Sequence, residues 1–272
     1  MSKAGGSSPT LSMSSDTAFR LLLRNIDFYN SRFMVERFLD KLIAWSKRLK
    51  RSYLAWRVKL KIQRNGPESP RAQDLDIYST PSFGDLVSTW GEQTAWKEIE
   101  YLLVNCKGKV LDMACGTCVI FPKLSKFEYC DLYGCDISRY LIERAVQAGL
   151  PSSKLTACDA TKTPYGDDFF DHAYSIGSLE HFTEEGISAF LNESRRIARY
   201  STFHQIPVSR SNRDEGWIKL GQSYFNNSVD WWLNKFKAVY PKVYILDSEW
   251  EDPISVGKWF VCFKSEGNGW KN

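Results

Sequence analysis

Two acidic residues beside short apolar segments are the first candidates for chemistry in this chain. Asp112 follows the apolar residues 110–111 and leads into a loop of small residues, 114–118. Asp136 lies 24 positions later, in a second apolar segment over residues 132–137. A loop of small residues lets backbone N–H groups and a helix N-terminus approach a nucleotide-like ligand. An acid near this offset binds ribose hydroxyls in doubly wound folds. The sequence therefore predicts a site for an adenosine-type ligand.

Two more segments extend the pattern. Residues 154–160 form a third strand-like segment, and residues 169–176 form a fourth that runs into residues 177–182. With these, the sequence resembles the class I S-adenosylmethionine (SAM) dependent methyltransferases. The motifs D-x-x-C-G-T, G-x-D-x-S, D-A and F-D-x-x-x-S-x-x-x-L-E-H-F carry the resemblance, in that order. It covers roughly residues 90–264 and implies SAM as cofactor, S-adenosylhomocysteine as its product, and no metal.

The resemblance also implies which residues hold SAM. Asp112 and the small residues after it would lie against the amino-acid part of SAM. Asp136 would accept hydrogen bonds from the ribose hydroxyls. Residues 137 and 159–160 would contact the adenine. The expected cofactor-binding residues are Asp112, Ala114, Gly116, Thr117, Asp136, Ile137, Asp159, Ala160 and Ser175. Cys118 departs from the family pattern, which usually has glycine there, so its side chain would narrow the approach to the ligand or shift the backbone.

Three residues near the strand ends are candidates for catalysis. Methyl transfer from a sulfonium is an in-line displacement, for which the protein mainly supplies alignment and excludes water. A hydroxyl acceptor also needs a base, and an imidazole suits that task at neutral pH. His181 is the first candidate and His204 the second, with Glu180 as an acceptor or cofactor contact. Alternatively, His181 packs behind the loop or caps the next helix, and Glu180 is a solvated carboxylate at a helix start.

The acceptor pocket is expected to come from residues 208–225 and from the N-terminal extension. Arg210 and Arg213 would bind a phosphate or carboxylate on the acceptor, or else remain solvated. Trp217 and Tyr224 would supply aromatic surface.

The alternation of strand and helix patterns predicts an α/β fold. The expected architecture is a doubly wound, mostly parallel, seven-stranded sheet that ends in an antiparallel pair, with an N-terminal basic helical extension. We divide the chain into a disordered tail (1–16), a basic amphipathic helical extension (17–65), a linker (66–89), a methyltransferase domain (90–264) and a C-terminal tail (265–272).

The positive charge of the chain is concentrated in the extension. Residues 20–72 hold 14 Lys and Arg against four Asp and Glu. Basic residues interleaved with aromatic and aliphatic ones suit the surface of an anionic membrane. The same pattern fits helices that cap the active site and leave their charges in solvent, and nucleic acid is a third, less favoured partner.

The cysteines and the hydropathy of the chain indicate the compartment in which we expect the protein. Seven cysteines, an odd number, do not form a disulfide framework, and C-x-x-C at residues 115–118 has no second pair to complete a metal site. No segment is apolar enough to span a bilayer. We expect a cytoplasmic protein, with peripheral contact at the inner face of a membrane as an addition.

These observations predict an enzyme. The expected activity is methyl transfer from SAM to an oxygen or nitrogen of a small-molecule or glycan-type acceptor, lipid-linked if the basic helices bind membrane. The alternative is a non-catalytic protein that keeps the methyltransferase fold and binds a partner or a membrane.

Overall fold

Residues 15–65, 73–90, 92, 94–219 and 222–265 are described by the computed structural model of the chain; within the first helix, only residues 34–61 have described side chains. The chain divides into two units, residues 1–54 and 55–272. Most of the two predicted tails and residues 66–72 of the predicted linker lie outside the described residues.

The predicted helical extension is one continuous helix, α1 (Ser15–Asn65). Eight exposed, large apolar side chains of residues 34–61 share one face, since they fall within an arc of about 100° at 3.6 residues per turn. This apolar stripe consists of Met34, Val35, Phe38, Leu42, Trp45, Leu49, Tyr53 and Trp56. The charged residues of the segment, nine basic and two acidic, all lie outside that arc.

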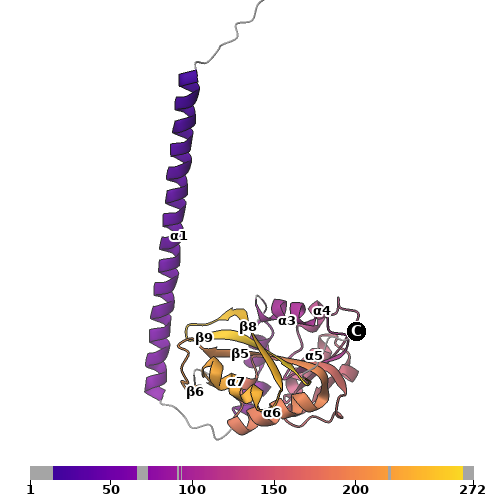
Figure 1. The fold of residues 1–272 in the computed structure, drawn as a ribbon. Helices are drawn as coiled ribbons and strands as arrows, with labels where there is room; N and C mark the ends of the chain where they lie inside the picture. Colours follow the sequence, from indigo (N-terminus) through magenta and orange to yellow (C-terminus); the bar gives the residue numbers. More distant parts are fainter. Residues whose placement is uncertain (1–14, 66–72, 91, 93, 220–221, 266–272) are drawn as a thin grey trace, which may run out of the picture. The chain divides into compact units, whose positions relative to one another are not determined.

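The second unit is built on a seven-stranded sheet, as the sequence predicts (Figure 1). Its strand order is β3-β2-β1-β4-β5-β9-β8. The first five are parallel, and β9 runs antiparallel to both β5 and β8. The strands are β1 (Gly108–Met113), β2 (Cys130–Asp136), β3 (Leu155–Ala157), β4 (Phe170–Ile176), β5 (Ala198–Ser209), β8 (Lys242–Glu251) and β9 (Ser255–Phe263).

The strand order reverses at β1, which lies between β2 and β4. Asp112 of β1 is in register with Gly134 of β2 and Tyr174 of β4. The carboxyl ends of these parallel strands therefore meet at one edge of the sheet. In open α/β sheets this is where ligands bind.

Helices cover both faces of the sheet and form two hydrophobic cores. On one face, α6 (Glu184–Ile197) and α7 (Val229–Lys237) bury Phe190, Trp232 and Phe236 against the strands. The other core contains residues of α3 (Ala95–Leu103), α4 (Phe121–Leu124) and α5 (Arg139–Gln147). Serines at the N-caps of α5 and α7 and a threonine at that of α6 accept backbone hydrogen bonds, which fixes where these helices begin.

Two segments outside the sheet are more ordered than the sequence suggests. The described part of the predicted linker contains the short 3₁₀ helix η1 (Leu75–Ser79) and the helix α2 (Pro81–Val87). Thr80 is the N-cap of α2 and Pro81 is its first residue. This pair is a typical helix start, which the prediction of a linker over residues 66–89 did not take into account. Between β5 and α7, β6 (Trp217–Lys219) and β7 (Ser223–Phe225) form a two-stranded hairpin.

Among the described helices, none is long and apolar enough to cross a membrane.

Candidate active site

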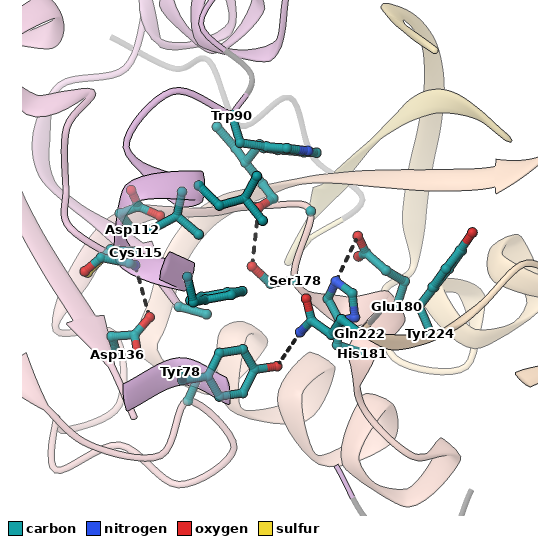
Figure 2. Close-up of a pocket in the computed structure, with 18 of the residues that line it drawn as sticks. Tyr78, Trp90, Asp112, Cys115, Asp136, Ser178, Glu180, His181, Gln222 and Tyr224 are labelled. Carbon is teal, nitrogen blue, oxygen red and sulfur yellow. Dashed lines mark hydrogen bonds and ion pairs between the residues drawn. The ribbon is translucent and has the colours of Figure 1, made fainter. Parts of the chain in front are cut away.

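A cavity of about 510 Å³ lies at the carboxyl edge of the sheet. Figure 2 shows Asp112, Cys115 and Asp136 on one side of Ser178, and Glu180, His181, Gln222 and Tyr224 on the other. The first group comes from β1, β2 and the loop between them, and we call its side of the cavity the donor half. The second comes from η3 (Leu179–His181) and the β6–β7 hairpin, and we call its side the acceptor half.

Asp136 organises the donor half. Its two carboxylate oxygens accept hydrogen bonds from the backbone N–H groups of Gly116, at 2.9 Å, and Ser138, at 2.8 Å. Burial raises the pKa of Asp136 to about 6, while these two N–H donors oppose the shift. Because Gly116 follows β1 and Asp136 ends β2, this carboxylate ties the two strand ends together.

The loop after β1 turns sharply. Ala114 and Gly116 have φ angles of 58° and 57°, in the left-handed region that favours glycine. This turn leaves the backbone of the loop against the cavity, which both residues line. Asp112, 5% exposed, lies beside them, and its pKa is raised well above its usual range by burial and by the nearby Asp136.

The charge of the donor half suits the cationic groups of SAM. SAM carries an ammonium group and a sulfonium, and the described residues that line the cavity include buried carboxylates but no Lys or Arg. Ile137, 43% exposed, and residues 159–160 also line it, where the sequence places the adenine contacts. Among the described residues, no cluster of His, Cys, Asp and Glu could hold a metal ion.

Cys118 takes the glycine-like conformation that its place in the motif requires. Its φ is 52°, and the side chain is buried, 1% exposed. A Cβ built on Gly134 of β2 would lie 2.8 Å from the Cys118 sulfur, so the thiol packs on that strand. Cys118 does not line the cavity and therefore does not narrow it.

Two of the expected cofactor residues are not brought to the cavity. Thr117 is 6% exposed, with its hydroxyl 3.5 Å from that of Ser88. Ser175 is fully buried and hydrogen-bonds His204 Nδ1 at 2.9 Å. His204 is itself fully buried between the rings of Phe190 and Phe236, and burial lowers its pKa to about 3. The structure thus gives His204 no access to an acceptor, and we do not retain it as a base.

Glu180 and His181 line the acceptor half as the sequence predicts. His181 Nδ1–H donates to the carbonyl of Ser223 at 2.8 Å, which leaves Nε2 as the free ring nitrogen, 3.7 Å from Glu180 Oε1. Burial lowers the pKa of His181 to about 4 and raises that of Glu180 to about 8. At neutral pH the imidazole is uncharged and Glu180 is mostly protonated.

Two residues of the cavity wall, Tyr78 and Trp250, were not predicted. Tyr78 of η1 accepts a hydrogen bond from Gln222 at 2.8 Å, so the segment before the sheet is joined to the hairpin after it (Figure 2). Trp90 and Trp250 lie with ring centroids 5.8 Å apart. All four of these side chains line the cavity. In the sequence, the helix start at Thr80 and Pro81 was the signal that this segment is ordered.

Arg210 has a structural role in place of the predicted ligand contact. Its guanidinium donates to Glu251 Oε2 at 2.9 Å and to the carbonyls of Asp252 and Ser255, at 2.8 and 3.1 Å. Neither Arg210 nor Arg213 lines the cavity, and Trp217 is buried in the core, whereas Tyr224 lines the cavity as expected.

Comparison with known proteins agrees with this geometry. Residues 110–200 match a family model described as a methyltransferase domain. Three solved structures have a similar fold. The 1,6-didemethyltoxoflavin-N1-methyltransferase of Burkholderia thailandensis is 16% identical, with a TM-score of 0.52, over 74% of this chain and 95% of that one. The Haloferax volcanii partner of the Trm112 methyltransferase activator is 12% identical, with a TM-score of 0.54, over 72% and 99%. A SAM-dependent methyltransferase of Thermotoga maritima is 13% identical, with a TM-score of 0.50, over 66% and 92%.

No curated protein matches the chain by sequence. The seven-stranded sheet with its antiparallel end is the Rossmann-like fold of these methyltransferases. The family-model match at residues 110–200 confirms the resemblance carried by the four motifs, all of which lie within that range.

Proposed function

We propose that the protein transfers a methyl group from SAM to an oxygen or nitrogen of a small-molecule or glycan-type acceptor. The observation that supports this most is the continuity of the cavity from Asp112 and Asp136 to Glu180 and His181. A donor at the strand ends and an acceptor beside η3 would share one enclosed space. The structurally similar Burkholderia enzyme, crystallised with a small heterocycle and S-adenosylhomocysteine, is an example of such an acceptor class.

The chain's own residues would bind and align the two substrates. SAM supplies a methyl group that is already activated by its sulfonium. Asp136 would hold the ribose and Asp112 the amino-acid part, and Ile137 would pack against the adenine. In the acceptor half, the free Nε2 of His181 and the carboxyl of Glu180 are the groups available to take a proton from the acceptor. The aromatic rings that line the cavity, Trp90, Tyr224 and Trp250 among them, would help to keep water from the reacting atoms.

Calorimetric titration with SAM and S-adenosylhomocysteine tests the donor half. We expect both to bind and Asp136→Ala to abolish the heat. Asp247→Ala is the matched control, because that carboxylate is 86% exposed on β8. An absence of heat from both ligands with the unaltered protein would refute the enzyme proposal in favour of the non-catalytic alternative.

For α1 we propose a peripheral contact with an anionic membrane. The apolar stripe would enter the headgroup region while the basic side chains around it meet the lipid charge, each contributing about 1 kcal/mol. The excess of nine basic over two acidic residues in 34–61 favours this partner over a neutral one. A cap over the active site, the other proposal for this helix, requires no lipid.

Co-sedimentation with phosphatidylserine-containing vesicles distinguishes the membrane contact of α1 from the cap over the active site. Binding should weaken as salt is raised. Trp45→Ala, on the stripe, should reduce binding, whereas Ile43→Ala, exposed on another face of the helix, should not. Retention of the protein in the supernatant at low salt would refute the membrane contact.

A further inference from the structure

We propose that the methyl acceptor is a cationic amine and that Glu180 is the residue that binds it and takes its proton. This inference rests on the proposed methyl transfer and narrows its acceptor class. It follows from the charge of the cavity wall, the surroundings of Glu180 and the aromatic residues beside it.

The ionisable side chains of the described cavity wall are mainly carboxyl groups. The wall carries five carboxyl groups, on Asp112, Asp136, Asp159, Glu180 and Asp252, and no Lys or Arg among its described residues. Three belong to the donor half, where a bound SAM would meet them. Glu180 and Asp252 are left for the acceptor half. An acceptor with a phosphate or carboxylate would find no cation in this wall.

One carboxylate oxygen of Asp252 is held by the backbone. Its Oδ1 accepts hydrogen bonds from the N–H groups of Ile254, at 2.8 Å, and Ser255, at 2.5 Å, which form the turn between β8 and β9. Glu180 differs, because Oε2 is buried without any hydrogen-bond partner in the described structure and the whole residue is 2% exposed. Its other oxygen is 3.7 Å from His181 Nε2, which is uncharged.

A buried carboxyl oxygen without a partner is costly unless a ligand supplies one. The neighbouring imidazole cannot, because its N–H is used by the carbonyl of Ser223. A bound ammonium group would donate a charge-assisted hydrogen bond to Oε2. Glu180 lines the cavity, so its carboxyl group borders the space in which an acceptor would lie.

Aromatic rings complete the cation site. The ring of Tyr224 lies 6.1 Å from that of His181, edge on, and Figure 2 shows Tyr224 beside Glu180. The rings of Trp90 and Trp250, with centroids 5.8 Å apart, line the same cavity. Aromatic faces attract an ammonium group and pack against an apolar body. The combination of one carboxyl with several aromatic rings therefore favours an amine that carries an apolar or aromatic portion.

The transfer can be written with its protons and electrons balanced. The ammonium group of the acceptor gives one proton to the ionised Glu180, which frees the nitrogen lone pair. That lone pair forms the bond to the methyl carbon of the donor. The electron pair of the sulfur–carbon bond stays on sulfur, which becomes a neutral thioether. The product is an N-methylammonium ion, and Glu180 later releases its proton to solvent.

Binding to the protein loaded with S-adenosylhomocysteine tests the inference. The probes are 2-phenylethylamine, tyramine and tryptamine, each compared with its alcohol and carboxylate analogues by calorimetry. We expect at least one amine to bind about tenfold or more tightly than its two analogues. Affinity should increase from pH 6 to pH 9 as Glu180 ionises, over the range in which these amines stay protonated.

Glu180→Gln should remove this preference and the pH dependence. Its matched control is Glu184→Gln, four residues further on, whose carboxylate is half exposed and paired with Lys235. Binding of S-adenosylhomocysteine in the same samples reports the proposed function separately. If that ligand binds while no amine does, or while an alcohol or carboxylate binds as tightly as its amine, the amine inference is overturned. Failure of S-adenosylhomocysteine to bind overturns both proposals.

Discussion

Replacing Gly177 with alanine is a direct test of how the roof of the cavity is built. Gly177 follows β4 with a φ of 61°, and a Cβ placed there would lie 2.4 Å from Trp90 Cη2 and 2.9 Å from Cζ3. Ordinary carbon contacts are about 3.5–4.0 Å. The indole would therefore have to retreat by about 1 Å, against its neighbour Trp250.

Two effects lower the free energy of unfolding of the Gly177→Ala variant, and they add. The left-handed backbone conformation costs a residue with a side chain about 1–2 kcal/mol. Overpacking against the half-buried ring of Trp90 adds up to about 1–3 kcal/mol. We expect Gly177→Ala to lose about 2–5 kcal/mol in the free energy of unfolding and to bind S-adenosylhomocysteine more weakly, because Trp90 lines the cavity.

Urea unfolding and calorimetry measure these two effects, and the chain offers a control for each cost. Gly149 has a φ of 98° with nothing within 4 Å of a Cβ, so Gly149→Ala carries the backbone cost alone. In a Trp90→Ala background, Gly177→Ala should likewise lose only the backbone cost. Equal losses for Gly177→Ala with and without Trp90 would refute the assignment of this indole to the cavity roof.

Three further predictions concern ionisation and the donor loop. His181→Ala should keep S-adenosylhomocysteine affinity and lower turnover by less than Glu180→Gln does, because Glu180 is the group proposed to take the acceptor's proton; a fall of about 100-fold or more in single-turnover assays would instead make His181 the base. Because the pKa of Glu180 is raised to about 8 on folding, its contribution to stability is present below about pH 4.5 and is lost as pH rises through 8. Urea unfolding at pH 5 and 9 should thus show a larger fall for the unaltered protein than for Glu180→Gln, by up to about 4 kcal/mol, and parallel curves would contradict the shift. Cys118→Ala should leave S-adenosylhomocysteine affinity unchanged, because the thiol faces β2; a tenfold change in calorimetry would show otherwise.

The donor half was predictable from sequence because its parts follow one another along the chain. Asp112, the small residues after it and Asp136 mark the ends of adjacent strands, and strand alternation alone brings such ends to one edge. The antiparallel end of the sheet was also predicted, from two strand patterns close together. Ile137 and residues 159–160 reached the cavity for the same reason.

The acceptor half depends on contacts between distant residues. Tyr78 meets Gln222 across 144 positions, and neither residue carries a local signal for that contact. His204 looked close to a strand end, yet β5 continues to Ser209 and pairs His204 with Phe260 of β9. The helices that cover this face bury the imidazole, which no pattern within β5 reveals.

The two walls of the cavity come from different stretches of the chain. Residues 110–160 supply most of the donor wall, whereas the acceptor wall is assembled from η1, η3, the β6–β7 hairpin and the turn after β8. If the proposed function holds, changes to the cavity-lining residues of the hairpin or the turn would alter the choice of acceptor and leave the proposed SAM contacts in place. The hairpin joins β5 to α7 outside the seven-stranded sheet, but its Trp217 and Phe225 are buried in the core. Exchanging only Gln222 and Tyr224, which line the cavity, would therefore alter the proposed acceptor side and keep the core contacts.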